Sequence, residues 1–107
     1  MANSFKNAAV DLTTTNATTL YTVPSATTTI VKSILVSEDS GNADTITVTL
    51  TNASSAVFSL FKVKAVGANA TIELLTAPLV VTESEIIDLT AATANRLHVV
   101  ASLLEVS

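Results

Sequence analysis

His98 is the only histidine in the chain, and it is the one side chain whose ordinary charge change falls near neutral pH. A Ser-His-Asp site would also need a serine presented on a sharp turn, and the sequence has no Gly-x-Ser-x-Gly motif to present one. Zinc needs at least three protein ligands, which one histidine without cysteine does not supply. We interpret His98 as a structural residue of an apolar strand and predict no catalytic residue and no metal site.

The carboxylates form two local groups that could do chemistry. Asp39 and Asp44 enclose a Ser-Gly-Asn-Ala stretch whose oxygens could bind Ca²⁺ in a loop, but the group lacks the spacing and the closing glutamate of a helix-loop-helix site. Glu83 and Glu85, with Asp88, could form an acid-base pair. Polar turns explain both groups more simply, so we predict no enzyme activity, no cofactor and no small-molecule substrate.

The charge pattern excludes two classes of partner. The formal net charge is −4, and the basic residues are scattered along the sequence: Lys6, Lys32, Lys62, Lys64 and Arg96. Phosphate recognition needs clustered lysine and arginine, so we predict no nucleic-acid partner and no binding to an anionic membrane. The start of the chain does not have the pattern of a signal peptide, and no stretch has the length of a membrane span. We expect synthesis in a cytoplasm.

Threonine alternates with Ile46, Val48 and Leu50 along residues 45–51, which is the clearest structural signal in the sequence. A period of two places the aliphatic residues on one face and the threonines on the other, as in a half-buried strand. Strands are predicted at residues 8–12, 20–23, 28–37, 45–51, 57–65, 71–76, 79–82, 86–89 and 97–106. The segments 71–76 and 79–82 flank Pro78 and form either two strands or one bent strand.

Short strands separated by turn residues predict an all-β fold. The spacing is typical of an antiparallel β-sandwich, jelly-roll-like or immunoglobulin-like, with about seven or eight strands. The length of 107 residues predicts a single domain, residues 1–107. Residues 1–7 are polar apart from Phe5, and we expect them to form an N-terminal arm that reaches a neighbouring subunit. Because aromatic residues make up only 4% of the chain, the core is expected to consist of aliphatic side chains.

Three of the predicted strands are apolar on both faces, unlike a strand with one solvent-exposed face. In 28–37, Ile30, Ile34 and Val36 alternate with Val31 and Leu35, and the strands 57–65 and 97–106 show the same excess. Bulges that switch the phase would bring all of these side chains into one core. We favour the alternative, in which the second face is a subunit interface. The predicted interface residues are Phe5, Val31, Leu35, Phe58, Leu60, Val100 and Leu104.

Several segments together carry a resemblance to a known group of proteins. They are Leu20-Tyr-Thr-Val-Pro24, residues 29–37, Ile72-Glu-Leu-Leu75, Pro78-Leu-Val-Val81 and residues 99–106. From Leu20 to its end, the chain resembles small β-rich virion proteins of tailed bacteriophages, including cyanophages. It departs from their pattern at Pro24-Ser-Ala, where a Pro-Ala-Gly turn is common, and at Glu83-Ser-Glu-Ile, where a Glu-x-Gly-Asp hairpin is common. These departures affect turn geometry more than the fold.

The resemblance implies a non-enzymatic structural role in the virion, because these relatives carry no catalytic motif. The expected role is that of a capsid decoration or cement protein, assembled as a homotrimer on the major capsid protein or another virion protein. The alternative is a tail, baseplate or fibre accessory module. A carbohydrate- or receptor-binding module is a further alternative, and its platform would have to come from Phe5, Tyr21, Phe58 and Phe61.

Overall fold

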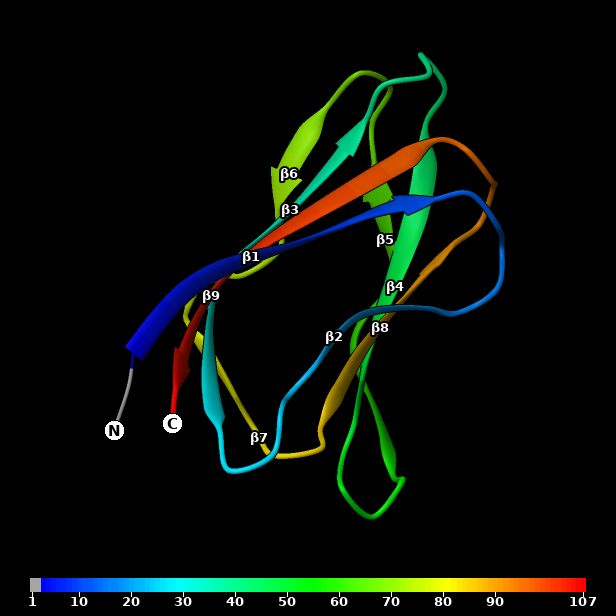
Figure 1. The fold of residues 1–107 in the computed structure, drawn as a ribbon. Helices are drawn as coiled ribbons and strands as arrows, with labels where there is room; N and C mark the ends of the chain where they lie inside the picture. Colours follow the sequence, from blue (N-terminus) through cyan, green and yellow to red (C-terminus); the bar gives the residue numbers. More distant parts are fainter. Residues whose placement is uncertain (1–2) are drawn as a thin grey trace.

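The computed structural model describes residues 3–107, and every regular element in that range is a β-strand (Figure 1). The strands are β1 (Asn3–Leu12), β2 (Thr18–Thr22), β3 (Thr28–Glu38), β4 (Asp44–Thr51), β5 (Val57–Val66), β6 (Thr71–Glu73), β7 (Leu79–Thr82), β8 (Ile86–Ala91) and β9 (Leu97–Val106). The predicted all-β class is confirmed, with nine strands where about seven or eight were expected. In residues 3–107 there is no helix of the length and apolarity needed to cross a membrane.

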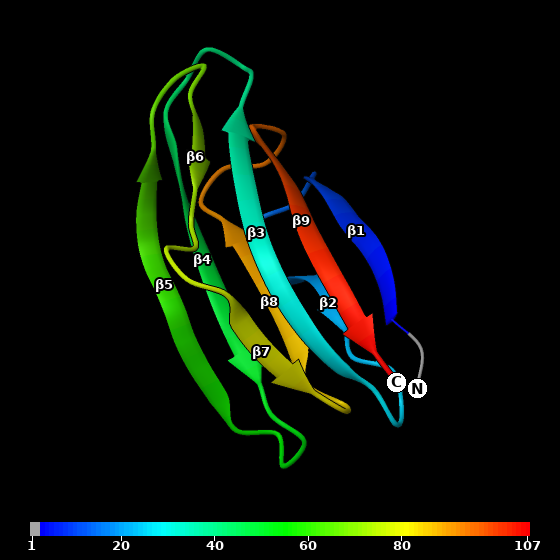
Figure 2. The ribbon, with the colours of Figure 1, turned by 90° about the vertical axis from the view of Figure 1, so that its left-hand side faces the viewer.

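The strands form two antiparallel sheets that face each other as a sandwich (Figure 2). The five-stranded sheet has the order β1-β9-β3, and both β6 and β7 pair with the remaining edge of β3. The four-stranded sheet has the order β2-β8-β4-β5. β7 pairs with the beginning of β3 and β6 with its end, so the break around Pro78 gives two short strands. The predicted antiparallel sandwich is therefore the observed architecture.

The core between the sheets is aliphatic, as the shortage of aromatic residues predicted. Its buried members are valine, isoleucine, leucine and alanine side chains. Ile46 and Val48 of β4 are fully buried, so the alternation in residues 45–51 gave the correct inner face. Leu50 is partly buried and packs against the same cluster. The regular period of two was enough to orient this strand, because β4 pairs with β8 without a register shift.

A bulge in β3 decides which of its aliphatic side chains enter the core. The register with β9 shifts between Val31 and Ser33, so Lys32 is the extra residue. Val31 and Ile34 are both fully buried, and Leu35 points outward. The prediction that Val31 lies on an outward face, opposite Ile34, is therefore wrong. The bulge produces the phase switch that was the alternative explanation for this strand.

The side chain of Glu73, on the neighbouring β6, stabilises the bulge. Its carboxylate accepts hydrogen bonds from the Ser33 hydroxyl, from the Ile34 N–H at 2.8 Å and from the Leu75 N–H at 3.1 Å. The Leu74 N–H donates to the Ile34 carbonyl at 2.9 Å. Burial tends to raise the pKa of Glu73, but these hydrogen bonds outweigh it and lower the pKa. Backbone groups released by the bulge are thus satisfied by a side chain distant in the sequence.

The polar N-terminal segment is part of a sheet and does not form a separate arm. β1 pairs with β9 over its whole length, from Asn3 opposite Val106 to Leu12 opposite Leu97. The expected arm of residues 1–7 is corrected for residues 3–7, while Met1 and Ala2 lie outside the described residues. β1 is an edge strand, and edge strands commonly carry charged and polar side chains, so the polarity of residues 3–7 is compatible with a strand.

Two matched substitutions test the position of Val31. Val31→Ala should lower the free energy of unfolding by about 1–3 kcal/mol, because it removes buried methyl groups and leaves a cavity. Val57→Ala, at an exposed position of β5, should change it by less than about 0.5 kcal/mol. Urea denaturation of both variants measures the difference. Equal effects would contradict the burial of Val31.

Candidate functional site

A row of apolar side chains crosses the outer face of the five-stranded sheet. Phe5 of β1 lies opposite Leu104 of β9, Leu104 lies opposite Ile30 of β3, and Ile30 lies opposite Val80 of β7. Directly opposite residues share a face of the sheet. Phe5 is 76% exposed and Val80 is 56% exposed, while Ile30 and Leu104 are partly buried between them. The row therefore presents apolar surface on every strand it crosses.

A second row lies closer to the other end of the same face. Ala9 of β1 is opposite Val100 of β9, and Val100 is opposite Leu35 of β3. Val100 and Leu35 are 42% and 41% exposed. We define the apolar outer face as the residues of these two rows: Phe5, Ala9, Ile30, Leu35, Val80, Val100 and Leu104. The surface between the rows is polar: Asn7, Ser102 and Ser33 lie opposite one another there, beside the bulge residue Lys32.

The outer face of the four-stranded sheet has the opposite character. The threonines of β4 alternate with its buried residues, and Thr47 lies opposite Thr90 of β8. Asp88 of β8 lies between Thr49 and Thr19, and the Thr19 hydroxyl donates to Asp88 Oδ1 at 2.8 Å. Hydroxyl and carboxylate groups of this kind are well solvated in water. The outer face of the four-stranded sheet is therefore mainly polar, with Val57 and Ile86, opposite Thr51, among its aliphatic residues, while the other outer face is mainly apolar.

The predicted interface residues fall into three places. Phe5, Leu35, Val100 and Leu104 belong to the apolar outer face. Phe58, which is exposed, and Leu60, which is partly buried, lie on β5 at an edge of the other sheet. Val31 lies in the core, as described above. The structure thus brings four of the seven predicted residues together on one surface.

Leu60 lines a small apolar cleft at the open side of the sandwich. The cleft has a volume of about 260 Å³ and lies between β5 and the connection from β6 to β7. Its wall includes Phe61, Leu75, Pro78 and Leu79. β5 has register shifts against β4, and the backbone of its Val63 adopts a φ of 50°. A positive φ is strained for a β-branched residue such as valine. The Val63 N–H donates a hydrogen bond to Thr47 Oγ1 on the neighbouring strand at 3.0 Å.

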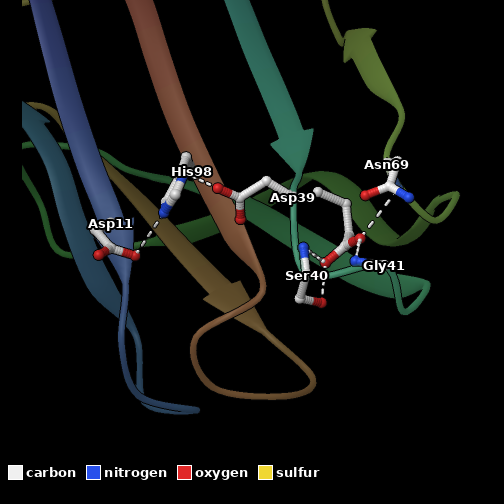
Figure 3. A network of polar contacts seen from close by, with 7 residues as sticks. Asp11, Asp39, Ser40, Gly41, Asn69 and His98 are labelled. Atoms are coloured by element: carbon white, nitrogen blue, oxygen red, sulfur yellow. Dashed lines mark hydrogen bonds and ion pairs between the residues drawn. The ribbon is translucent and has the colours of Figure 1, made fainter.

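Charged groups lie within the apolar outer face and beyond one end of it. Between the two rows, the ammonium of Lys32, the bulge residue, lies 5.8 Å from the centroid of the Phe5 ring. Beyond the second row, His98 Nε2 is 3.2 Å from Asp11 Oδ1, and His98 Nδ1 is 3.4 Å from Asp39 Oδ2 (Figure 3). His98 thus connects β9 to β1 and to the turn after β3. In residues 3–107 no group of three or more His, Asp or Glu side chains is arranged to hold a metal ion.

A carboxylate that the sequence did not single out, Glu38, orders the turn after β3, where Ser40 and Gly41 lie (Figure 3). It is almost fully buried and accepts hydrogen bonds from the Ser40 hydroxyl and from three backbone N–H groups. The three donors are Ser40 at 2.8 Å, Gly41 at 3.0 Å and Asn69 at 3.1 Å. Burial tends to raise the pKa of Glu38, but these hydrogen bonds outweigh it and lower the pKa to about 2. Glu38 therefore joins the β3–β4 turn to the β5–β6 turn.

The carboxylates that could have formed acid-base or cation sites each have a structural partner. Asp44 accepts from the Thr93 N–H at 3.2 Å, and Glu83 accepts from the Ala26 N–H at 2.8 Å. Glu85 accepts from the Thr82 N–H at 2.7 Å, and Asp88 is bonded to Thr19. These contacts order turns and strand ends. They agree with the interpretation of both acidic groups as polar turns.

Tyr21 points into a polar network between the two sheets. Its hydroxyl donates to Glu105 Oε2 and lies 2.8 Å from Thr29 Oγ1, and Glu105 Oε1 pairs with Lys6 Nζ at 2.9 Å. Burial and the hydrogen bond to Glu105 raise the pKa of Tyr21 to about 12. The hydrogen bonds from Tyr21 and Lys6 lower the pKa of Glu105. Because Tyr21 is held inside this network and Phe5 and Phe58 lie on different sheets, the aromatic residues do not form one sugar-binding platform.

Comparison with known proteins shows little similarity of sequence. No protein-family model and no curated protein matches this chain. Among solved structures, a chain in the structure of infectious bursal disease virus Gt strain has a similar arrangement, with a TM-score of 0.42 and 9% sequence identity. The match covers 98% of this chain and 30% of that chain, so this chain spans less than a third of its length. A likeness at this level carries no argument about function.

The stability of the protein should depend on pH through Glu38. Its carboxyl has a pKa of about 2 when folded and an ordinary value of 4.5, so the unfolded chain binds more protons between these values. The contribution is therefore complete above about pH 5 and is lost as the pH falls towards 2. Glu38→Gln should reduce the proton uptake on unfolding by up to about one proton near pH 3–4. Urea denaturation of the wild type and of Glu38→Gln across this pH range measures the difference in proton uptake. Ser40→Ala, which removes the hydroxyl donor to Glu38, is the control and should have an intermediate effect. An unchanged pH dependence in Glu38→Gln would contradict the role of this carboxylate.

The ionisation of Tyr21 can be followed directly, because it is the only tyrosine and tryptophan is absent. An ultraviolet absorbance titration of the folded protein should have its midpoint near pH 12, and the urea-unfolded chain should have it near the ordinary value of 10.0. Since the folded pKa is raised, this group stabilises the fold below about pH 10 and loses its contribution as the pH rises through 12. Glu105→Gln should lower the folded midpoint. Coincident midpoints for folded and unfolded wild type would contradict the network.

Proposed function

We propose that this protein is a non-enzymatic structural component of a virion, and specifically a capsid decoration protein of a tailed bacteriophage. The observation that supports this proposal is the difference between the two outer faces of the sandwich. One face presents mainly threonine and aspartate, with Val57 exposed on β5, and the other presents Phe5, Val80, Val100 and Leu35. A large apolar side chain left in water forgoes about 1.5–3 kcal/mol of burial, so a face of this kind suits a protein that is covered by partners.

The proposed mechanism is the addition of many small contacts over an assembly. Sibling subunits and the major capsid protein, or another virion protein, bury the apolar outer face. Opening the shell would then also require breaking these contacts, so bound subunits stabilise the closed shell by mass action. The homotrimer predicted from the sequence is one closed arrangement of the siblings. The resemblance to phage virion proteins supports the same role, and a tail, baseplate or fibre module is the alternative position.

The apolar outer face should control the incorporation of the protein into particles. The double variant Leu35→Ser and Val100→Ser should reduce its copy number on purified particles at least about tenfold at limiting protein, because two partly exposed apolar contacts are lost. A matched control, Thr45→Ser with Thr49→Ser on the other face, should be incorporated as the wild type is. Quantitative mass spectrometry of the particles gives the copy number.

Gold-labelled antibody on intact particles separates the two positions in the virion. Label over the shell supports a decoration protein, and label confined to the tail supports the alternative. Absence of the protein from purified particles would overturn the virion role altogether. Circular dichroism of each variant verifies that the fold is retained.

A further inference from the structure

We propose that the free edge of β1 pairs with β1 of a second copy of this chain, antiparallel, so that two five-stranded sheets become one continuous sheet. β1 is the last strand on its side of the sheet, and no other strand of residues 3–107 lies beyond it (Figure 2). This inference goes beyond the proposed function, because the contact is a strand edge and not the apolar outer face. It does not depend on the virion role.

The other edges of the two sheets carry features that hinder pairing with another chain. β5 has two register shifts against β4 and exposes Lys62 and Lys64. β2 has five residues and a register shift against β8, while β6 and β7 have only three and four residues. β1, in contrast, has ten residues and pairs with β9 without any shift. Among the described strands, β1 therefore offers the longest regular edge to another chain.

Hydrogen bonds on the far side of β3 fix the orientation of its backbone after the bulge. The Glu38 N–H donates to the Ala70 carbonyl at 2.9 Å, beside β6. The Ile34 carbonyl accepts from the Leu74 N–H at 2.9 Å on the same side. In an antiparallel ladder the N–H and C=O groups of alternate residues point to the same neighbouring strand. The odd-numbered residues of this segment of β3 therefore point to β9, where their partners are even-numbered.

The same alternation identifies the free backbone groups of β1. The odd-numbered residues of β9 point to β1, and their partners on β1 are even-numbered. The bond from the Asn95 N–H to the Leu12 carbonyl at 2.9 Å agrees with this orientation, because Asn95 lies just before β9. The N–H and C=O groups of the odd-numbered residues therefore point out of the free edge. These residues are Asn3, Phe5, Asn7, Ala9 and Asp11.

A two-fold axis through Asn7, perpendicular to the sheet, pairs each of these five residues with one of the second copy. Asn7 lies opposite Asn7, Phe5 lies opposite Ala9 of the second copy, and Asn3 lies opposite Asp11 of the second copy. Each such pair exchanges two bonds, so the edge forms about ten hydrogen bonds. The rotation keeps the outer faces of both copies on the same side of the joined sheet.

The same register aligns the side chains on the two outer faces. Phe5 ends the first apolar row at the edge of the sheet, and Ala9 ends the second row. Placing Phe5 opposite Ala9 of the second copy joins the first row of each copy to the second row of the other. The polar surface around Ser102 and Asn7 meets its own equivalent at the axis. Apolar residues thus continue as apolar rows, and polar residues as one polar row.

The neighbouring registers oppose unsuitable side chains. Opposite residues of a sheet share a face, so the axis can move only by whole residues along β1. An axis at Ala8 would place Phe5 opposite the carboxylate of Asp11. An axis at Lys6 would place two ammonium groups directly opposite each other, which is unfavourable. The axis at Asn7 avoids both arrangements.

Both charged side chains of β1 are already bonded within their own copy, so they do not prevent the pairing. Lys6 Nζ lies 2.9 Å from Glu105 Oε1, and Glu105 is opposite Ser4, on the side of Lys6 away from the axis. With the axis at Asn7, the two Lys6 residues are diagonal neighbours whose ammonium groups are held apart in this way. Asp11 contacts His98, with Oδ1 3.2 Å from Nε2.

Substitutions at Asn7 test the position of the axis by sedimentation equilibrium of the full chain. The wild type should reach a limiting mass about twice the 11.0 kDa of the monomer. Asn7→Asp and Asn7→Lys should each raise the dissociation constant of the dimer about tenfold or more, because like charges would lie directly opposite each other. An equimolar mixture of the two variants should restore association, since the opposed charges then attract. Ser54→Asp and Ser54→Lys, in the exposed turn after β4, are the controls and should leave the dimer unchanged.

Proline substitutions test the backbone pairing independently. Ala9→Pro removes an N–H that points out of the free edge, so the monomer keeps its ladder with β9 and its fold. The proline ring occupies the position of the second strand, and the dimer should be lost. Ala8→Pro removes an N–H that points to β9 and should lower the midpoint of urea denaturation. Circular dichroism of each variant verifies its fold.

The outcomes separate this inference from the proposed function. A wild type that stays monomeric up to about 1 mM, or one that reaches a limiting mass of three subunits, would overturn the pairing. So would a mixture of the two Asn7 variants that associates no better than either alone, or a dimer that persists in Ala9→Pro. A monomer that is still incorporated into particles would overturn the pairing and leave the virion role intact. A dimer that is absent from particles would support the pairing and overturn the virion role.

Discussion

The pairing of β3 with β9 is the interaction on which the five-stranded sheet depends. β1 is attached to the sheet only through β9, and β6 and β7 are attached only through β3. The bulge at Lys32 lies within this central pair, so it determines the orientation of every β3 side chain on either side of it. Which β3 side chains lie in the core and which lie on the outer face therefore depends on this single extra residue. Glu73 satisfies the backbone where the ladder is interrupted.

Much of the fold can be predicted from the sequence because most strands end at recognisable turns. The strand 79–82 has the predicted bounds, and the strand 97–106 also has them. The regular alternation of residues 45–51 identified the buried face of β4. Pro78 marked a break between residues 71–76 and 79–82, although the sequence pattern was equally consistent with one bent strand and with two separate strands. The two-sheet architecture follows from these elements with little further information.

The remaining features depend on contacts between residues far apart in the chain. In β3 the aliphatic residues are Ile30, Val31, Ile34 and Leu35, so the sequence pattern allows either alternate set to face the core. The bulge that decides which side chains do so is hydrogen-bonded to Glu73. The first half of β1 is too polar to be recognised as a strand, and β9 supplies its pairing partner. Glu38 belongs to a stretch that has the composition of a solvated turn, yet it is nearly fully buried and bonded to Asn69. The candidate interface was therefore predicted only in part. Four of its residues were identified from the sequence, but the register of β3 with β9 was needed to assign Val31 to the core.

The order of the strands also has a consequence for biosynthesis. β9 lies between β1 and β3 in the sheet, but it is the last of the described strands to leave the ribosome. Until it emerges, β1 has no neighbour in its sheet, and β3 lacks the partner on one side. The nascent chain therefore has to hold its earlier aliphatic strands without a complete sheet until β9 emerges, a stage at which unpaired strand edges can associate with other chains. Insertion of β9 between β1 and β3 then completes the hydrogen bonding of both neighbours in one step.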